Sequence, residues 1–126
     1  MVNIYFLKIL YNMYSFLLLT NYERYLMLVK MEIDLAKGFG SWKEMFINNE
    51  HKLNAHGGKL VFAGTPNDNE NKLTVIMDFV SMEALKNFGG DEELTKTRVE
   101  AGAMVETGVM TIMSEASFTS TKPEIN

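Results

Sequence analysis

The sequence predicts an α+β domain built on one antiparallel sheet, and two observations carry this prediction. Apolar and polar residues alternate after residue 27 in the order strand, helix, strand, strand, helix, strand. The composition also changes near residue 30, because all five tyrosines lie before that point and Lys8 is the only charge before Glu23. A chain of 126 residues has the length of one domain. We therefore expect residues 27–118 to form the folded unit.

Residues 1–26 are expected to be an apolar extension that lies outside this unit. The apolar run at residues 9–19 follows Lys8 and resembles the central part of a signal peptide. The Thr-Asn-Tyr-Glu sequence at 20–23 offers no cleavage site of small residues, and the run is short for a membrane span. Three interpretations remain: an extension upstream of the natural start, a helix on a membrane surface, and an uncleaved anchor. We favour the first, so membrane contact is not expected.

Charge and cysteine content exclude several classes of protein. The chain carries a net charge of −4, of which residues 1–30 contribute +2, so the remainder carries −6. Without a basic stripe beside the aromatic residues, nucleic-acid binding is not expected. The chain has no cysteine, which rules out disulfides, thiolate zinc sites and a cysteine nucleophile. This composition fits a reducing compartment, and we expect a cytoplasmic protein.

The first half of the domain has the pattern of a strand followed by a helix. Residues 25–35 alternate as the first strand. Ser41 is expected to begin the helix, because Ser41 and Glu44 have the spacing of a capping box. Gly57 and Gly58 end it. The apolar arc of this helix comprises Trp42, Met45, Phe46, Asn49, Leu53 and His56.

Three further segments have strand patterns. Residues 59–64 and 72–80 are separated by a polar turn rich in Asn and Asp, as in a hairpin. Residues 105–118 contain the last strand, centred on 109–113. Residues 119–126 form a polar tail.

Two short helices are expected between the third and fourth strands. Ser81 caps the first of them, and Gly89 and Gly90 interrupt the helical pattern. Asp91 caps the second, which continues to Gly102.

The two β-α-β halves predict a ferredoxin-like βαββαβ fold, in which the helices cover one face of the sheet. The other face is normally polar. Here apolar residues occur on both faces of the strands, as Ile76 and Val80 do in one strand and Met110 and Ile112 do in another. Helices can cover only one face. We therefore predict a homodimer that packs through its sheet faces.

Several motifs resemble the dimeric α/β barrel superfamily, which includes antibiotic-biosynthesis-monooxygenase-like and stress-responsive barrel proteins. They are Gly-Phe-Gly-Ser-Trp-Lys-Glu-Met-Phe at 38–46, Ala-His-Gly-Gly at 55–58, Val-Ile-Met-Asp-Phe at 75–79 and Ser-Met-Glu-Ala-Leu at 81–85. The resemblance covers residues 28–118 and is closest to an uncharacterised family of short bacterial proteins. It implies a dimeric barrel with ligands bound between helix and sheet. Members range from oxygenases, haem-degrading enzymes and isomerases to proteins without known chemistry.

His56 is the first candidate for a catalytic residue. It lies at the end of the apolar arc, so it is expected to project into the cleft between helix and sheet, where the resemblance implies that ligands bind. A histidine there could act as an acid, a base or a haem ligand. The alternative, which we favour, is a histidine that interacts with the carbonyl end of its own helix. His51 lies on the opposite side of the helix, and a spacing of five residues prevents both histidines from binding one metal. No metal site is predicted.

The apolar arc also predicts a ligand pocket, lined by Trp42, Phe46, Asn49 and His56. In this interpretation the aromatic rings form the walls and Asn49 is the polar contact. The alternative is an ordinary core stripe, with the asparagine obliged to find a partner.

Asp78 is the third catalytic candidate after His56 and Asn49, because it interrupts the second face of the strand at 72–80. It is either a base of raised pKa or a partner of Arg98. The alternative, which we favour, is an aspartate that reaches solvent or caps the helix beginning at Ser81.

Three functions follow, and no cofactor is predicted for any of them. We favour a small homodimer that binds a partly apolar molecule or has a stress-related role without catalysis. The second is a cofactor-independent monooxygenase-like enzyme, in which Trp42, Asn49 and His56 orient an aromatic or polyketide-like substrate. The third is a protein interaction module that uses its sheet face. An enzyme predicts a pocket in which His56 and Asn49 converge, a binding protein predicts a pocket without an acid–base pair, and an interaction module predicts no pocket.

Overall fold

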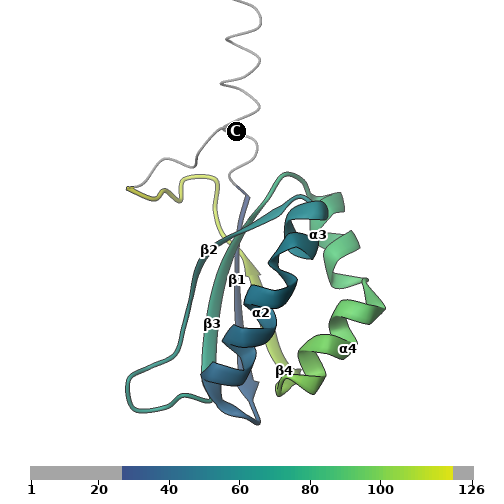
Figure 1. Ribbon diagram of the computed structural model, residues 1–126. Coiled ribbons are helices and arrows are strands. Elements are labelled where there is room, and N and C mark those ends of the chain that lie inside the picture. The colour runs from purple at the N-terminus through teal and green to yellow at the C-terminus, as the bar shows by residue number, and fades with distance from the viewer. Residues whose placement is uncertain (1–26, 121–126) are drawn as a thin grey trace, which may run out of the picture.

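The computed structural model describes residues 27–120, so the predicted extension at 1–26 and the last six residues of the tail lie outside the described part. The elements are β1 (Met27–Leu35), α2 (Gly38–Ala55), β2 (Gly58–Gly64), β3 (Lys72–Phe79), α3 (Met82–Gly89), α4 (Glu92–Glu100) and β4 (Ala103–Ile112) (Figure 1).

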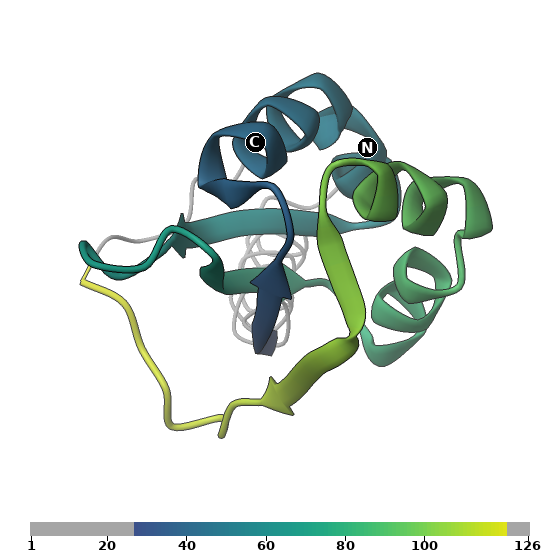
Figure 2. The same ribbon diagram turned by 90° about the horizontal axis from the view of Figure 1, so that it is seen from below.

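The four strands form one antiparallel sheet in the order β2-β3-β1-β4. The three helices lie together on one side of this sheet, which Figure 2 shows from below. This arrangement confirms the predicted ferredoxin-like fold, because each half contributes a strand, a helical connection and a second strand. Within residues 27–120, no helix has both the length and the apolar character needed to cross a membrane.

The core lies between the sheet and the helices. Alternate residues of β3 face the helices, and the same alternation gives β1 one buried row. Each buried aliphatic or aromatic side chain contributes roughly 1.5–3 kcal/mol relative to an exposed one. The most deeply buried side chains are Val29, Leu53, Leu73 and Phe79.

Helix α2 begins at Gly38, so the predicted start at Ser41 is wrong. Ser41 is exposed within the first turns, and no side chain caps the helix. Gly38 has a φ of 82°, a conformation that glycine adopts without strain, and it turns the chain directly from β1 into the helix. A Cβ added to Gly38 would meet the carboxylate of Glu70 at 3.0 Å. An acidic group from the β2–β3 loop therefore lies at the positive end of the helix dipole, where the capping box was expected to act.

The two predicted caps in the second helical region are confirmed. The Oγ atom of Ser81 accepts a hydrogen bond of 3.0 Å from the N–H of Ala84. The Oδ1 atom of Asp91 accepts one of 3.0 Å from the N–H of Leu94. The chain breaks between α3 and α4 at Gly89 and Gly90, as the sequence predicts.

Strand β4 begins at Ala103, two residues before the predicted segment, and pairs with β1 through an irregular register. The partner of Glu32 is Val109, whereas the partner of Asp34 is Met104. This irregularity places Met110 beside Met31, on the side of the sheet that carries the helices. The last strand thus directs a methionine toward the space beneath α4.

The sheet face opposite the helices has a mixed composition. Its central strand β1 presents Lys30 and Glu32, which form an ion pair of 3.8 Å. The flanking strands present apolar side chains, among them the exposed Phe62 and Val109. The predicted apolar second face is therefore charged along β1, and it is apolar on the two edge strands and at Ile76 of β3.

The tight packing at the start of β2 yields a prediction about stability. A Cβ on Gly58 would lie 2.4 Å from Leu53 Cδ1 and 2.7 Å from Phe79 Cε1, both fixed core atoms. We expect Gly58→Ala to lower the free energy of unfolding by about 1–3 kcal/mol through overpacking. Gly40→Ala is the matched control, because nothing lies within 4 Å of that position, and it is expected to be neutral or stabilising. Urea unfolding of both variants distinguishes them, and equal effects would contradict the prediction.

Candidate functional site

The main candidate site is a cavity of about 330 Å³ between the helices and the sheet. Helix α2, the α3–α4 region and strands β1, β3 and β4 all contribute to its lining. The walls are predominantly apolar and include Met31, Trp42, Leu73, Met77, Val105 and Met110.

Helix α2 lines the cavity with the face that its sequence predicts. All members of the predicted arc except His56 are lining residues. The rings of Phe39 and Trp42 are stacked with centroids 6.0 Å apart, and those of Trp42 and Phe46 with centroids 5.3 Å apart. Trp42 and Phe46 form one wall of the cavity, and Phe39 extends the stack outside the lining. Trp42, the chain's only tryptophan, is buried within this stack.

Asn49 provides a polar group on this wall. Its Nδ2 donates a hydrogen bond of 2.8 Å to the carbonyl oxygen of Met45, one turn earlier in the same helix. This bond anchors the amide on the helix surface. The amide oxygen accepts no hydrogen bond from the described residues, so it remains an acceptor for a bound molecule.

Arg98 of α4 is the charged residue of the lining. Its Nη2 donates to Thr95 Oγ1 at 3.1 Å, and its guanidinium carbon lies 5.2 Å from the centre of the Phe88 ring. Its Nε is buried and has no hydrogen-bond partner among the described residues. Burial lowers the pKa of the guanidinium, and the charge of Asp91 acts in the opposite direction. An arginine nevertheless keeps its charge, so the cavity contains a fixed positive group.

The sequence contains a signal for the inward position of Arg98. It lies four residues after Leu94 and shares its helix face, and Leu94 is buried in the core. Continuing the inward face of α4 from Leu94 would have placed the arginine inside. The composition of α4, which is rich in exposed charges, concealed this.

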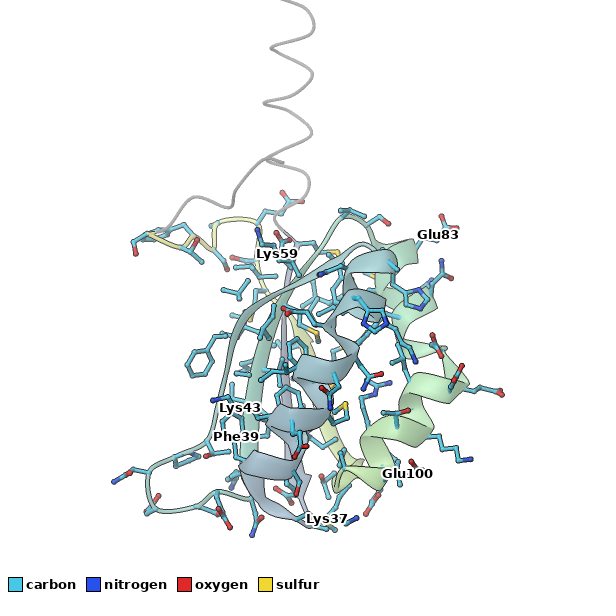
Figure 3. All side chains as sticks on the ribbon, viewed as in Figure 1. Lys37, Phe39, Lys43, Lys59, Glu83 and Glu100 are labelled. Carbon is cyan, nitrogen blue, oxygen red and sulfur yellow. The ribbon has the colours of Figure 1, made fainter. Side chains whose placement is uncertain are left out.

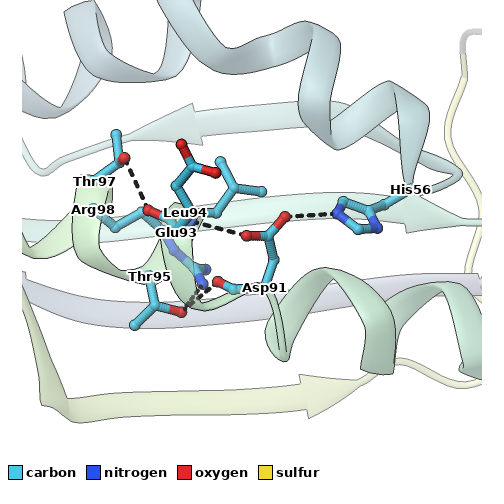
Figure 4. Close-up of polar contacts among 7 residues, drawn as sticks. All are labelled: His56, Asp91, Glu93, Leu94, Thr95, Thr97 and Arg98. Atoms are coloured by element: carbon cyan, nitrogen blue, oxygen red, sulfur yellow. Dashed lines mark hydrogen bonds and ion pairs between the residues drawn. The ribbon is translucent and has the colours of Figure 1, made fainter.

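A short polar network connects Arg98 to the start of its helix (Figure 4). The hydroxyl of Thr95 accepts from Arg98 and donates a bond of 3.0 Å to the carbonyl oxygen of Asp91. Because both functions of this hydroxyl are used, the guanidinium is held at a defined position on α4.

His56 ends helix α2 and is turned toward the start of α4. Its Nε2 lies 2.9 Å from Asp91 Oδ2, and its ring meets the Phe88 ring edge-on at 6.1 Å. It is not among the residues that line the cavity. The hydrogen bonds from His56 and from the Leu94 N–H lower the pKa of the Asp91 carboxyl. The structure thus gives His56 a partner that the sequence did not reveal, and separates it from Asn49.

Asp78 lies on the sheet face opposite the cavity. Its Oδ1 accepts a hydrogen bond of 3.0 Å from the N–H of Met27. Burial raises the pKa of its carboxyl, while the Met27 bond and the neighbouring Lys59 oppose the shift. The predicted pairing with Arg98 is not formed, because the two side chains lie on opposite sides of the sheet.

The described residues contain no group of three or more acidic or histidine side chains able to hold a metal ion. His51 is exposed on α2, as its position outside the apolar arc predicts.

No family model and no curated protein matches this sequence. Solved structures do match it. SnoaB, a cofactor-independent oxygenase from Streptomyces nogalater, is 12% identical over 78% of this chain and 97% of its own, with a TM-score of 0.54. A NIPSNAP-like domain protein from Burkholderia xenovorans is 14% identical over 79% and 93%, with a TM-score of 0.54.

The ActVA-Orf6 monooxygenase of Streptomyces coelicolor, solved in complex with nanaomycin D, is 13% identical over 80% of this chain and 95% of its own, with a TM-score of 0.50. The predicted resemblance to antibiotic-biosynthesis-monooxygenase-like proteins is therefore confirmed for the fold. Identities this low concern the fold alone, and they transfer no activity.

The His56–Asp91 contact predicts a pH-dependent stability. The pKa of Asp91 is lowered in the folded state, so its negative charge stabilises the fold above the ordinary pKa of about 4. This contribution is lost as the pH falls through the lowered value. Asparagine, like the protonated acid, offers one acceptor oxygen and one donor group in place of the two carboxylate oxygens that meet Leu94 and His56. We therefore expect Asp91→Asn to lower the melting temperature at pH 7. The difference from the wild type should disappear near pH 2.

Thermal unfolding between pH 7 and pH 2 checks this. Glu50→Gln removes an exposed carboxylate from α2 and serves as the control. If the Asp91→Asn difference persisted unchanged at pH 2, the carboxylate charge would not be its source.

Proposed function

We propose that this protein is a homodimer that binds a small, largely apolar molecule in the cavity between α2, α4 and the sheet. The supporting observation is the cavity itself. Its volume of about 330 Å³ falls at the lower end of the range for small-molecule sites. Its lining combines apolar walls with three polar side chains, Asn49, Thr95 and Arg98, as such sites commonly do.

Catalysis is the second candidate, because SnoaB is described as a cofactor-independent oxygenase and ActVA-Orf6 as a monooxygenase. The aromatic stack and Asn49 would suit a flat aromatic substrate. Yet the acid–base candidates do not converge in the cavity. His56 is held by Asp91 outside the lining, and Asp78 lies on the other side of the sheet. Binding without catalysis therefore accounts better for the arrangement, and the cavity itself argues against a pure interaction module.

The proposed dimer rests on the sheet face that no helix of residues 27–120 covers. Phe62 and Ile76 are cross-strand partners on this face, and Val109 lies beyond β1 on the same side. Val109 and Phe62 expose 57% and 52% of their surface. A second sheet would bury these flanks, and the alternating charges of Lys30 and Glu32 suit a self-complementary contact across a two-fold axis. A stress-related role and a cytoplasmic location stay predictions from the sequence.

Ligand binding in the cavity can be measured by the fluorescence of Trp42, which lies in the cavity wall formed by α2. We expect 1-octanol, a small neutral amphiphile, to change the emission in a saturable way. Val105→Phe places a larger ring in the lining and should weaken binding about tenfold or more, because the added ring competes with the ligand for the cavity volume. Val99→Phe makes the same substitution at a similarly exposed position of α4 that does not line the cavity, and this variant should bind normally. A Val105→Phe variant with wild-type affinity would contradict the proposed site.

The dimer is tested by analytical ultracentrifugation of the full chain at micromolar concentration. We expect the mass of two subunits for the wild type and of one for Phe62→Glu, since burying a carboxylate among the apolar side chains of the contact is unfavourable. Ile47→Glu is the matched control, because Ile47 is 62% exposed on α2, away from the sheet face, and this variant should remain dimeric. A wild type that sediments as a single folded subunit would rule out the dimer.

A further inference from the structure

The cavity contains a positive charge that a purely apolar ligand would leave uncompensated. Arg98 is the charged side chain in its lining, and the other lining residues are neutral. No carboxylate of the described residues lies within ion-pair distance of the guanidinium. The nearest acid that acts on it, Asp91, is already engaged by His56 and by the Leu94 N–H. A positive charge thus faces an apolar space without a matching anion.

The hydrogen-bonding capacity of Arg98 leads to the same point. A guanidinium has five N–H donors. One nitrogen is satisfied by Thr95, while the buried Nε–H has no acceptor within residues 27–120. A buried donor without a partner costs about 1–3 kcal/mol, and more when it belongs to a charged group. The contact with the Phe88 ring steadies the plane of the guanidinium but supplies no acceptor for the Nε–H.

From these observations we infer that the ligand carries one carboxylate group, which Arg98 binds, on an otherwise apolar body. This inference rests on the proposed binding function and adds the chemical class of the ligand. A carboxylate matches the planar fork of a guanidinium and can accept two N–H bonds at once.

The charge of the cavity favours a monoanion. One cation would leave a phosphate dianion only half neutralised among apolar walls, where an unpaired charge is costly. A bound water could accept the Nε–H bond but would leave the positive charge uncompensated. The rest of the ligand would lie against the methionines of β1 and β4 and the Trp42 and Phe46 rings of α2, whose surfaces are predominantly apolar.

The net charge of the chain does not assist the capture of an anion. The protein carries −4 overall, and α4 itself exposes Glu92, Glu93 and Glu100. Long-range steering would therefore disfavour a carboxylate. Any preference for an anion must come from the contact with Arg98, which makes the preference a specific test of that residue.

The test compares octanoate with 1-octanol, which share a chain length and differ in charge. In the wild type we expect octanoate to bind at least about tenfold more tightly than 1-octanol, as judged by Trp42 fluorescence; this corresponds to about 1.4 kcal/mol. Arg98→Gln should abolish the preference, so that octanoate no longer binds more tightly than 1-octanol to the variant. Lys96→Gln removes the same charge from an exposed position on the same helix and should retain the preference.

A measurement on the wild-type protein tests the inference even if the Arg98→Gln variant does not fold. The Nε–H resonance of Arg98 should shift and become protected from exchange with water when octanoate is added, and should respond little to 1-octanol. Equal affinity for both probes, with an unaltered Nε–H resonance, would overturn the carboxylate inference but leave the apolar binding site standing. Saturable binding of neither probe would overturn both the inference and the proposed function.

Discussion

The structure depends on the way in which α2 and α4 are fastened to each other at both ends. At one end Lys37, just before α2, donates through Nζ to the carbonyl oxygen of Glu100, the last residue of α4, at 2.8 Å. These two residues lie together at the lower end of the molecule in Figure 3. At the other end His56, just after α2, meets Asp91, just before α4, at 2.9 Å. The antiparallel helices are therefore tied at their tips, and the cavity lies between the ties.

This constraint explains why the cavity can persist in so small a domain. Close packing normally eliminates such volumes, since unfilled space deprives the lining side chains of contacts. Helices that were free to approach would reduce the space between Trp42 and Arg98. The polar ties fix the separation of the helix ends, and β4 supplies the floor through its irregular register, which turns Met110 inward. The capacity for a ligand thus depends on the spacing of the helices as well as on the residues that line the cavity.

The sequence predicted what depends on local periodicity and missed what depends on distant partners. Alternation in β1 and β3, the caps at Ser81 and Asp91, and the inward arc of α2 were all readable from neighbouring residues. The start of α2 was misplaced because its capping box competes with Glu70, about thirty residues away, which lies against Gly38. The partner of His56 is 35 residues distant, and no periodicity connects the two.

Under the proposed binding function, Arg98 brings the stability and the function of this domain into conflict. Domains of this size are stable by only about 5–15 kcal/mol, so an unpartnered buried donor is a substantial fraction of the total. A methionine at position 98 would fill the same space without that cost, as replacements of buried charges by apolar residues often do. The arginine is stabilised on one side by Thr95 and Phe88, and its remaining donor has no partner in the described chain. A ligand that supplies the acceptor removes the cost at the moment of binding, so the destabilisation of the empty site becomes part of the affinity for the occupied one.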